Sequence, residues 1–334
     1  MREKSIGVRP QLITPFLPGL AVSGVVAIAA TFLSVHYRAS AMLFALLLGM
    51  ALHFLAEEGQ CRAGIQVAAS VVLRTGVALL GLRITVEQVT ALGWTNVALV
   101  AGAVVATVVA GILIARAMRL STAFGTLTAG AVAICGVSAA LAIASILPKH
   151  KNAERDATFT AIGVTALSTI AMILYPLVVA AFGLDQHAAG VFLGGTIHDV
   201  AQVVGAGYSV SQETGDTATI VKLLRVAMLL PVCLAIGVAL HVRGREAARS
   251  APLLPWFAVV FAVLVVVNSL GWVPPPVASV GSEASRWCLV TAIAAIGMKT
   301  SLRSLVDMGL KPVLLVVFET LFLAALVMAA IALP

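Results

Sequence analysis

The stretch QVTALGWTNVALVAGAVVATVVAGILIA (88–115) contains no Asp, Glu, Lys or Arg. After the four residues RAMR it is followed by a second stretch without charged residues, LSTAFGTLTAGAVAICGVSAALAIASILP (120–148). A helix needs about 20 apolar residues to cross the hydrocarbon core of a bilayer. Each stretch is long enough, and together they predict membrane-spanning helices in this part of the chain.

The same pattern continues along most of the sequence. Further apolar segments are either free of charged residues or interrupted by only one or two of them. We therefore predict an all-α polytopic membrane protein with about 11 transmembrane helices, forming one transporter domain over 1–334 after a cytoplasmic segment at 1–18. The predicted spans lie near 19–35, 41–55, 64–82, 95–115, 122–147, 157–182, 186–207, 217–241, 253–272, 284–299 and 312–333.

The composition excludes several classes of protein. Of the 334 residues, 61% are hydrophobic and 10% are charged, whereas a soluble domain carries about 25% charged residues. A soluble enzyme, a nucleic-acid-binding domain and a secreted disulfide scaffold are therefore excluded. The net charge of +7 fits basic cytoplasmic loops, which also predict a cytoplasmic N-terminus; the loop KHKNAERD (149–156) does not fit this orientation.

The four cysteines are widely spaced. They form no CxxC pair, and the histidines do not gather near them. Such spacing is typical of small apolar packing residues rather than of zinc ligands or disulfides. We predict no metal site and no cofactor.

Two segments resemble each other at a constant offset. GLRITVEQVTALG (81–93) matches GMKTSLRSLVDMG (297–309) in its glycines, in a basic residue and in several apolar positions. The predicted spans that end in these segments cross the membrane in opposite directions. An inverted-topology internal repeat of this kind is common in secondary transporters, although the pattern can also mark two unrelated helix ends.

Glycines gather inside two of the predicted spans. TLTAGAVAICGVSAALAIASIL (126–147) contains Gly136 and Ser138, and GVFLGGTIHDVAQVVGAG (190–207) contains Gly195 among other glycines. Glycine disfavours a helix by about 1 kcal/mol relative to alanine, so both spans are predicted to be discontinuous helices. The N-terminus of a half-helix presents free N–H groups to an anion. The alternative is that these glycines serve only close helix packing.

Polar side chains accompany the second glycine-rich segment. Thr196 and Gln202 are candidates for hydrogen bonds to a substrate. Between them lie His198 and Asp199, a type of pair that can bind and release protons. We predict a role in ion coupling for this pair, against the alternative that His198 is a packing residue.

Five charged residues fall inside apolar segments. Arg74 lies near the centre of one span, and Lys222 and Arg225 lie one helical turn apart in another. Asp199 and Glu319 are the acidic counterparts. A charge at the membrane centre costs about 2.5–3.5 kcal/mol on insertion scales, so such residues normally pair or face an aqueous pathway. The surplus of positive charge favours an anionic substrate, although Lys222 and Arg225 could also extend toward the membrane surface.

Several motifs also resemble those of a known family. Together they resemble the YeiH-type sulfate exporter family of bacterial inner-membrane proteins, over about residues 40–330. The resemblance implies a multi-pass protein of the bacterial plasma membrane that exports sulfate or a related sulfur oxyanion. Val137 departs from the small polar residue expected in that family. The motifs are, in order, GVALLGLRIT, AICGVSAALAIAS, TIHDVAQVVGAG and TATIVKLLRVAMLLP.

The leading hypothesis is a secondary transporter, in the export direction, for a small inorganic or organic oxyanion such as sulfate, sulfite or an organosulfonate. It would work by alternating access in the lipid bilayer, with protons or sodium as coupling ions. A homo-oligomer is compatible with this hypothesis, and no nucleic acid is expected as a partner. The predicted substrate-binding residues are Arg74, Gly136, Ser138, Gly195, Thr196, Gln202, Lys222 and Arg225.

Two other classes of function remain open. A cation/proton antiporter would use Asp199 as its ion-binding carboxylate. An intramembrane enzyme is disfavoured, because the sequence lacks the motifs HExxH, GxGD and GxSG. We therefore expect a protein that is not an enzyme.

Overall fold

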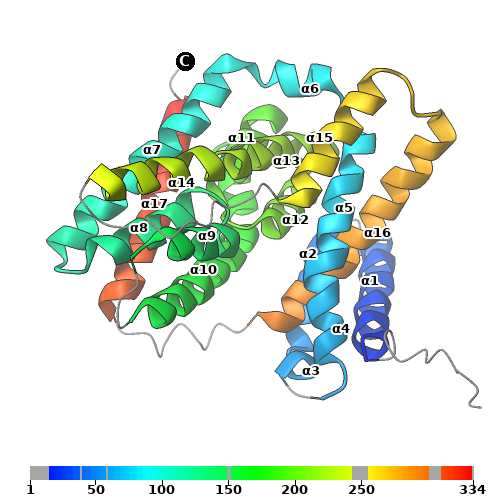
Figure 1. Ribbon diagram of the computed structural model, residues 1–334. Helices are drawn as coiled ribbons and strands as arrows, with labels where there is room; N and C mark the ends of the chain where they lie inside the picture. The colour runs from blue at the N-terminus through cyan, green and yellow to red at the C-terminus, as the bar shows by residue number, and fades with distance from the viewer. Residues whose placement is uncertain are drawn as a thin grey trace, which may run out of the picture. The chain divides into compact units, whose positions relative to one another are not determined.

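The computed structural model describes residues 15–37, 40–57, 59–148, 152–242, 255–300 and 310–332. These residues form helices and the turns between them, and they include no strand (Figure 1). This agrees with the all-α class predicted from the sequence. The elements are α1 (Leu17–Tyr37), α2 (Ala41–Ala51), α3 (Phe54–Glu57), α4 (Arg62–Val67), η1 (Ala68–Val72), α5 (Leu73–Leu79), η2 (Leu80–Leu82), α6 (Val86–Ala91), α7 (Gly93–Ala117), α8 (Thr122–Ala133), α9 (Val137–Ile146), α10 (Ala153–Ala181), α11 (Gln186–Thr196), α12 (Val200–Val210), α13 (Gln212–Ala227), α14 (Leu229–Val242), α15 (Trp256–Ser269), α16 (Pro275–Lys299) and α17 (Leu310–Ala332).

Within the described residues, six helical segments are long and apolar enough to cross a membrane. The shorter apolar helices α2, α8, α9, α12 and α15 coincide with further predicted spans. The total number of spans and the inverted repeat remain predictions, because part of the second copy of the repeat, at 301–309, lies outside the described residues. The six segments are Leu17–Tyr37, Arg62–Leu82, Gly93–Ala117, Ala153–Ala181, Gln212–Val242 and Leu310–Ala332.

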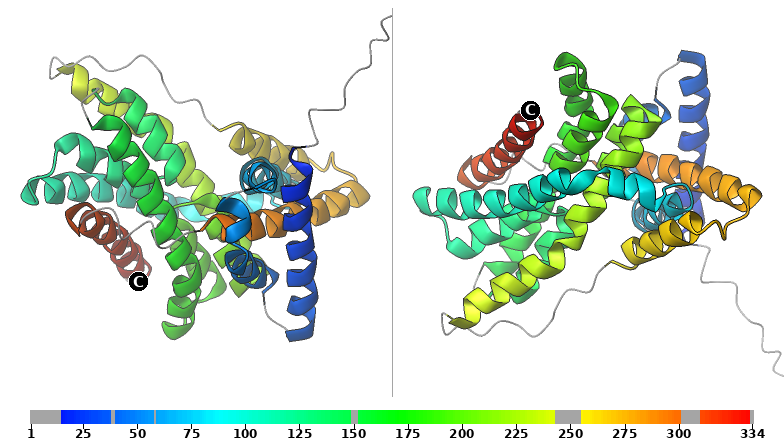
Figure 2. Two further views of the ribbon diagram at one scale, coloured as in Figure 1. Left: turned by 90° about the horizontal axis from the view of Figure 1, so that it is seen from below. Right: turned by 90° about the horizontal axis from the view of Figure 1, so that it is seen from above.

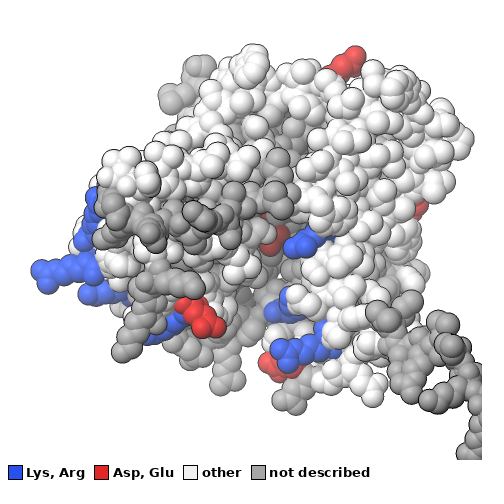
Figure 3. Space-filling view, in the orientation of Figure 1, with Lys and Arg blue, Asp and Glu red and all other residues white. Residues whose placement is uncertain are grey.

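The surface of the protein carries large apolar side chains. Phe32 is 71% exposed, Trp94 87% and Leu177 64%. On the face drawn in Figure 3, most of the described atoms belong to uncharged residues. Exposed apolar surface on this scale needs a nonpolar environment, so the chain is a membrane-type helical protein.

The chain divides into two compact units. The first comprises Met1–Gly76 and Arg286–Thr300, and the second comprises Val77–Ser285 and Ser301–Pro334. In the first unit, α2 and α16 approach closely where Gly49 faces Gly297. A Cβ atom at either glycine would collide with the main chain of the other helix. This is the small-residue contact by which membrane helices pack.

The second unit contains both predicted discontinuous helices. The helix formed by α8 and α9 is interrupted after Ala133, and α9 begins at Val137 after Gly136, whose φ is 63° and ψ is −124°. The helix formed by α11 and α12 is interrupted at Ile197, which is extended, and α12 begins after Asp199. The structure therefore confirms the interruption of both spans.

Continuous helices surround the two interrupted ones. Helix α13 packs against both α11 and α12, and α17 packs against α7, α8 and α11. Figures 1 and 2 show α17, in red, running beside α7. The two interruptions are thus enclosed by α13 and α17 within one compact unit.

Candidate functional site

The two helix interruptions lie next to each other. A Cβ atom built on Gly136 would lie 3.7 Å from the Cβ, C and O atoms of His198. Gly136 belongs to the first interruption and His198 to the second. Residues that are 62 positions apart in the sequence therefore meet where both helices lose their regular hydrogen bonds.

Lys222 joins the two interruptions through one side chain. It is fully buried and lies on α13. Its Nζ donates to the carbonyl oxygen of Ile134 at 2.7 Å and to that of Ile197 at 3.1 Å. One carbonyl comes from each interruption, so the ammonium group bonds to the unpaired ends of both α8 and α11.

Arg225, one helical turn further along α13, also donates hydrogen bonds to both interruptions. Its Nε donates to Ala133 at 2.9 Å and its Nη2 to Val132 at 2.8 Å. Its Nη1 donates to Gly194 at 3.0 Å and to Ile197 at 2.9 Å. All four acceptors are main-chain oxygens of the last turns of α8 and α11, where the partial charge of a helix is negative.

Neither cation extends to the surface of the protein. The side chain of Lys222 is 0% exposed and that of Arg225 is 1% exposed. Their donors are directed at main-chain oxygens at the ends of α8 and α11.

The N-termini of α9 and α12 differ in how they are capped. At the start of α12, the Asp199 carboxylate accepts a hydrogen bond from the Ala201 N–H at 3.0 Å, and the Asp199 N–H donates to Ser168 Oγ at 3.1 Å. At the start of α9, Gly136 supplies no side-chain cap, and Ser138 is exposed. The N-terminus of α9 therefore lacks the side-chain cap that α12 has.

Buried polar side chains line the second interruption. His198 is fully buried, and its Nε2 lies 3.0 Å from Thr320 Oγ1 of α17. Gln202 makes a long hydrogen bond of 3.5 Å to Thr169 Oγ1 of α10. Among the described residues, His198 Nδ1 and Gln202 Oε1 have no hydrogen-bond partner. Buried polar atoms without partners are uncommon in proteins and call for an explanation.

Two of the other predicted residues have structural contacts. Thr196 Oγ1 donates to the carbonyl oxygen of Phe192 at 2.6 Å. A Cβ atom on Gly195 would lie 3.3 Å from Val327 Cγ1, so this glycine allows α17 to pack closely on α11. Both residues lie at the end of α11, beside the acceptors of Arg225.

Arg74 is the one predicted site residue that belongs to the first unit. It lies on α5, and its side chain is exposed. The π-helical turn η1 immediately precedes α5, and such turns are frequent at functional sites. The other predicted site residues all belong to the second unit.

Sequence reasoning missed the hydroxyl groups that contact the site. Ser168 and Thr169 on α10 and Thr320 on α17 supply hydrogen-bond partners to Asp199, Gln202 and His198. Each lies in an ordinary apolar helix, and isolated Ser or Thr residues are common in such helices. Only the packing of α10 and α17 identifies them.

A second polar network lies at the other end of α12. The guanidinium of Arg83 forms a salt bridge with the Asp216 carboxylate and lies over the Tyr208 ring, 5.3 Å from its centroid. The Tyr208 hydroxyl donates to the same carboxylate at 2.6 Å. Asp216 also lines a pocket of about 610 Å³ with Gln186 and other polar residues. This network joins the segment after η2 to α12 and α13.

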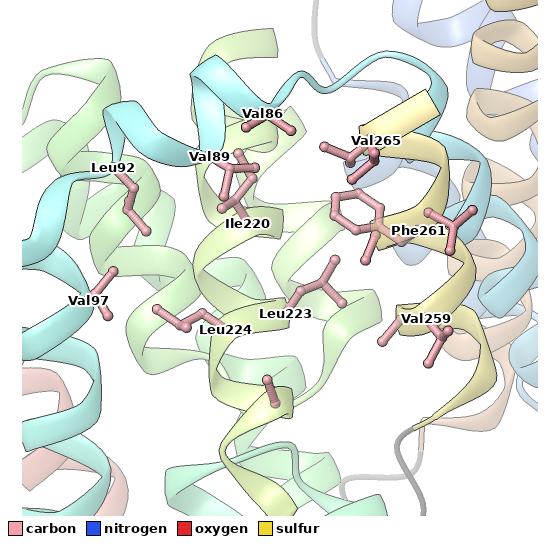
Figure 4. A pocket seen from close by; sticks show the side chains of 15 residues that line it. Val86, Val89, Leu92, Val97, Ile220, Leu223, Leu224, Val259, Phe261 and Val265 are labelled. Atoms are coloured by element: carbon pink, nitrogen blue, oxygen red, sulfur yellow. The ribbon is translucent and has the colours of Figure 1, made fainter. Parts of the chain in front are cut away.

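One pocket can be excluded as an anion site. It lies between α6, α13 and α15 and has a volume of about 540 Å³ (Figure 4). Its lining consists of apolar side chains such as Val89, Leu223 and Phe261. An anion there would lose its hydration without gaining a hydrogen bond.

Comparison with known proteins identifies the family. Residues 18–316 match the family described as Conserved hypothetical protein 698. A UPF0324 membrane protein of Chlorobaculum tepidum is 54% identical over 319 residues, which cover 95% of this chain and 89% of that protein. The UPF0324 membrane protein TauZ of Paracoccus denitrificans is 52% identical over 320 residues, or 95% of each chain. None of these descriptions denotes an enzyme. The chain therefore belongs to the UPF0324 membrane protein family, and its resemblance to the YeiH-type proteins is confirmed.

Proposed function

We propose that this protein is a secondary transporter of a small oxyanion, such as sulfate, sulfite or an organosulfonate. Export across the bacterial plasma membrane is the direction that the family resemblance implies. The observation that carries the proposal is the uncapped N-terminus of α9, which lies beside a second interrupted helix. Half-helix N-termini of this kind hold anionic substrate groups in secondary transporters.

The charges around the interruptions support an anionic substrate. Each helix end carries about half an elementary charge, positive at the N-terminus and negative at the C-terminus. The partial charges of the four half-helix ends therefore sum to zero, and the positive charge of Arg225 offsets the negative charge of Asp199. When Lys222 carries its proton, about one positive charge remains. The two cations bond to the C-terminal ends of α8 and α11. The N-terminus of α9 therefore stays available to the anion.

In this proposal the anion accepts hydrogen bonds from the first N–H groups of α9 and from the Ser138 hydroxyl. Gln202 contributes a side-chain N–H from the second interruption, and Thr196 contributes its hydroxyl when the hydrogen bond to Phe192 opens. His198 and Asp199 couple the movement of the anion to protons or sodium. Transport proceeds by alternating access, in which one part of the protein moves against the rest around the site.

The test places a negative charge at the proposed site. Ser138→Asp puts a carboxylate at the second position of α9, where it interacts favourably with the helix end and repels an anion. We expect purified wild type in proteoliposomes to transport radiolabelled sulfate. In the variant, sulfate affinity should fall by about tenfold or more, equivalent to about 1.4 kcal/mol.

Ser145→Asp is the matched control. Ser145 is also exposed on α9, two turns further along the helix, so the variant adds the same charge away from the N-terminus. It should keep the wild-type affinity. Equal affinity in the wild type and Ser138→Asp would contradict the proposal.

A cation/proton antiporter is the second candidate. The supporting observation is that the Asp199 carboxylate lies at the interruption and is partly exposed, whereas His198 beside it is fully buried. The same proteoliposomes distinguish the two functions. Proton release driven by a sodium gradient in the absence of sulfate, lost in Asp199→Asn, would favour the antiporter.

A further inference from the structure

Glu319 is a buried carboxyl group to which the proposed transport function assigns no role. It lies on α17 between α7 and α8, and the residue is 1% exposed. Gly111 of α7 faces it, and a Cβ atom there would collide with the Glu319 carboxyl group and with Ala129. Glycine at this position therefore leaves the space that the carboxyl group occupies.

The carboxyl group has few partners. The Thr128 hydroxyl donates to Glu319 Oε1 at 2.9 Å, and Oε2 has no hydrogen-bond partner among the described residues. No described Lys, Arg or His of α7, α8, α10 or α11 lies within ion-pair distance of it. An ionised carboxylate offers about four acceptor positions, and only one of them is used here.

This environment contrasts with that of the buried cations in the same unit. Lys222 and Arg225 are surrounded by main-chain oxygens that offset the loss of water. Glu319 has no such compensation for a negative charge, and burying an unpaired ion is costly. The neutral, protonated acid fits the site. On α7, Thr107 Oγ1 is also buried without a partner, one turn from Gly111.

Helix α17 connects this carboxyl group to the interrupted helices. Thr320, the next residue, contacts His198 at the second interruption. Thr128 lies on α8, whose last carbonyl oxygens bond to Arg225. A change in the charge of Glu319 would therefore act on both helices that border the proposed anion site.

We propose that Glu319 is a proton-binding site, which holds a proton in this conformation and exchanges it with water when α7 and α17 separate during transport. The O–H bond of the carboxyl group breaks, the proton passes to water, and a proton from water restores the acid. The coupling part of this proposal rests on the proposed transport function. The binding of the proton by Glu319 does not depend on that function.

Infrared spectroscopy of the purified protein at neutral pH tests the proton directly. A protonated carboxyl group has a C=O stretching band that ionised carboxylates lack. We expect this band in the wild type, a shift to lower frequency in heavy water, and its loss in Glu319→Gln. Glu87→Gln is the matched control, because Glu87 is exposed on α6, and it should keep the band.

A second variant keeps the proposal testable if Glu319→Gln does not fold. Thr128→Val removes the hydroxyl that donates to Glu319, so the band should persist at a changed frequency. The absence of the band in the wild type would overturn the proposal, as would its persistence in Glu319→Gln. Loss of the wild-type band on addition of sodium chloride, but not of choline chloride, would show that sodium displaces the proton from Glu319, and it would overturn coupling to protons alone.

Transport measurements test the coupling separately. In proteoliposomes, Glu319→Gln should exchange labelled sulfate at equal pH on both sides but lose the acceleration that a pH gradient produces in the wild type. Retained acceleration would contradict the coupling role. If the wild type moves no sulfate, the proposed function fails, and the infrared band alone still decides whether Glu319 binds a proton.

Discussion

Gly136 shows how a single residue shapes the site. Its φ of 63° and ψ of −124° lie in a region that residues with a Cβ atom rarely occupy. The conformation ends α8, turns the chain and lets α9 begin at Val137 without a side-chain cap from Gly136. The space around the residue is not the constraint, because the atoms nearest to an added Cβ are those of His198 at an ordinary contact distance of 3.7 Å.

Gly136→Ala should therefore destabilise the protein through backbone strain. We expect the free energy of unfolding to fall by about 1–3 kcal/mol, measured by denaturant unfolding in detergent. Gly102→Ala is the control, because Gly102 lies inside α7 with open space around it, where alanine favours the helix. An unchanged stability in Gly136→Ala would show that the conformation is not strained for other residues.

Among the elements, the interrupted helices depend on the two cations of α13. Arg225 supplies hydrogen bonds to four carbonyl oxygens from α8 and from the end of α11. Each buried polar group left without a partner costs about 1–3 kcal/mol. The side chain thus stabilises both interruptions at once.

Arg225→Met should lower the free energy of unfolding by more than about 3 kcal/mol. It removes the donor to the carbonyl oxygens of Val132, Ala133 and Gly194, while that of Ile197 keeps its bond to Lys222. Arg225→Lys should recover part of the loss, because an ammonium keeps the charge but lacks the planar arrangement of donors. Denaturant unfolding of the purified variants measures both effects. Arg62→Met changes an exposed arginine and should have little effect; an equal loss in Arg62→Met would refute the assignment.

The interruptions could be predicted from the sequence, and their partners could not. Glycines within charge-free segments mark a weak helix locally, as at Gly136 and Gly195. The carbonyl oxygens that Lys222 and Arg225 bind lie as many as 88 and 93 positions away, so only the tertiary packing brings them together. Contact of Lys222 and Arg225 with a substrate therefore stays a prediction, and in the structure their donors bond to the main chain.

At the scale of the whole molecule, the chain consists of two compact units, and Arg74 belongs to the one without the interrupted helices. Hydropathy predicted the helices of both units, because the bilayer imposes an apolar length on each span. The division into units depends on which helices contact one another. Periodicity along the sequence does not contain that information.

Arg74→Gln tests whether the first unit takes part in transport. The substitution removes a charge from an exposed side chain, so the protein should insert and fold normally. We expect sulfate flux in proteoliposomes to fall by about tenfold or more, as for loss of one interaction of about 1.4 kcal/mol. Flux equal to that of the wild type would remove Arg74 from the pathway.

The shared hydrogen bonds of Lys222 and Arg225 also restrict how the protein can move. Each side chain holds main-chain oxygens from both interrupted helices. Separating those helices would leave a charged group without its hydrogen-bond partners in a nonpolar interior. In the proposed transporter, the two half-helix pairs would therefore move together with α13, and a hinge that opens a path for solute would lie outside them.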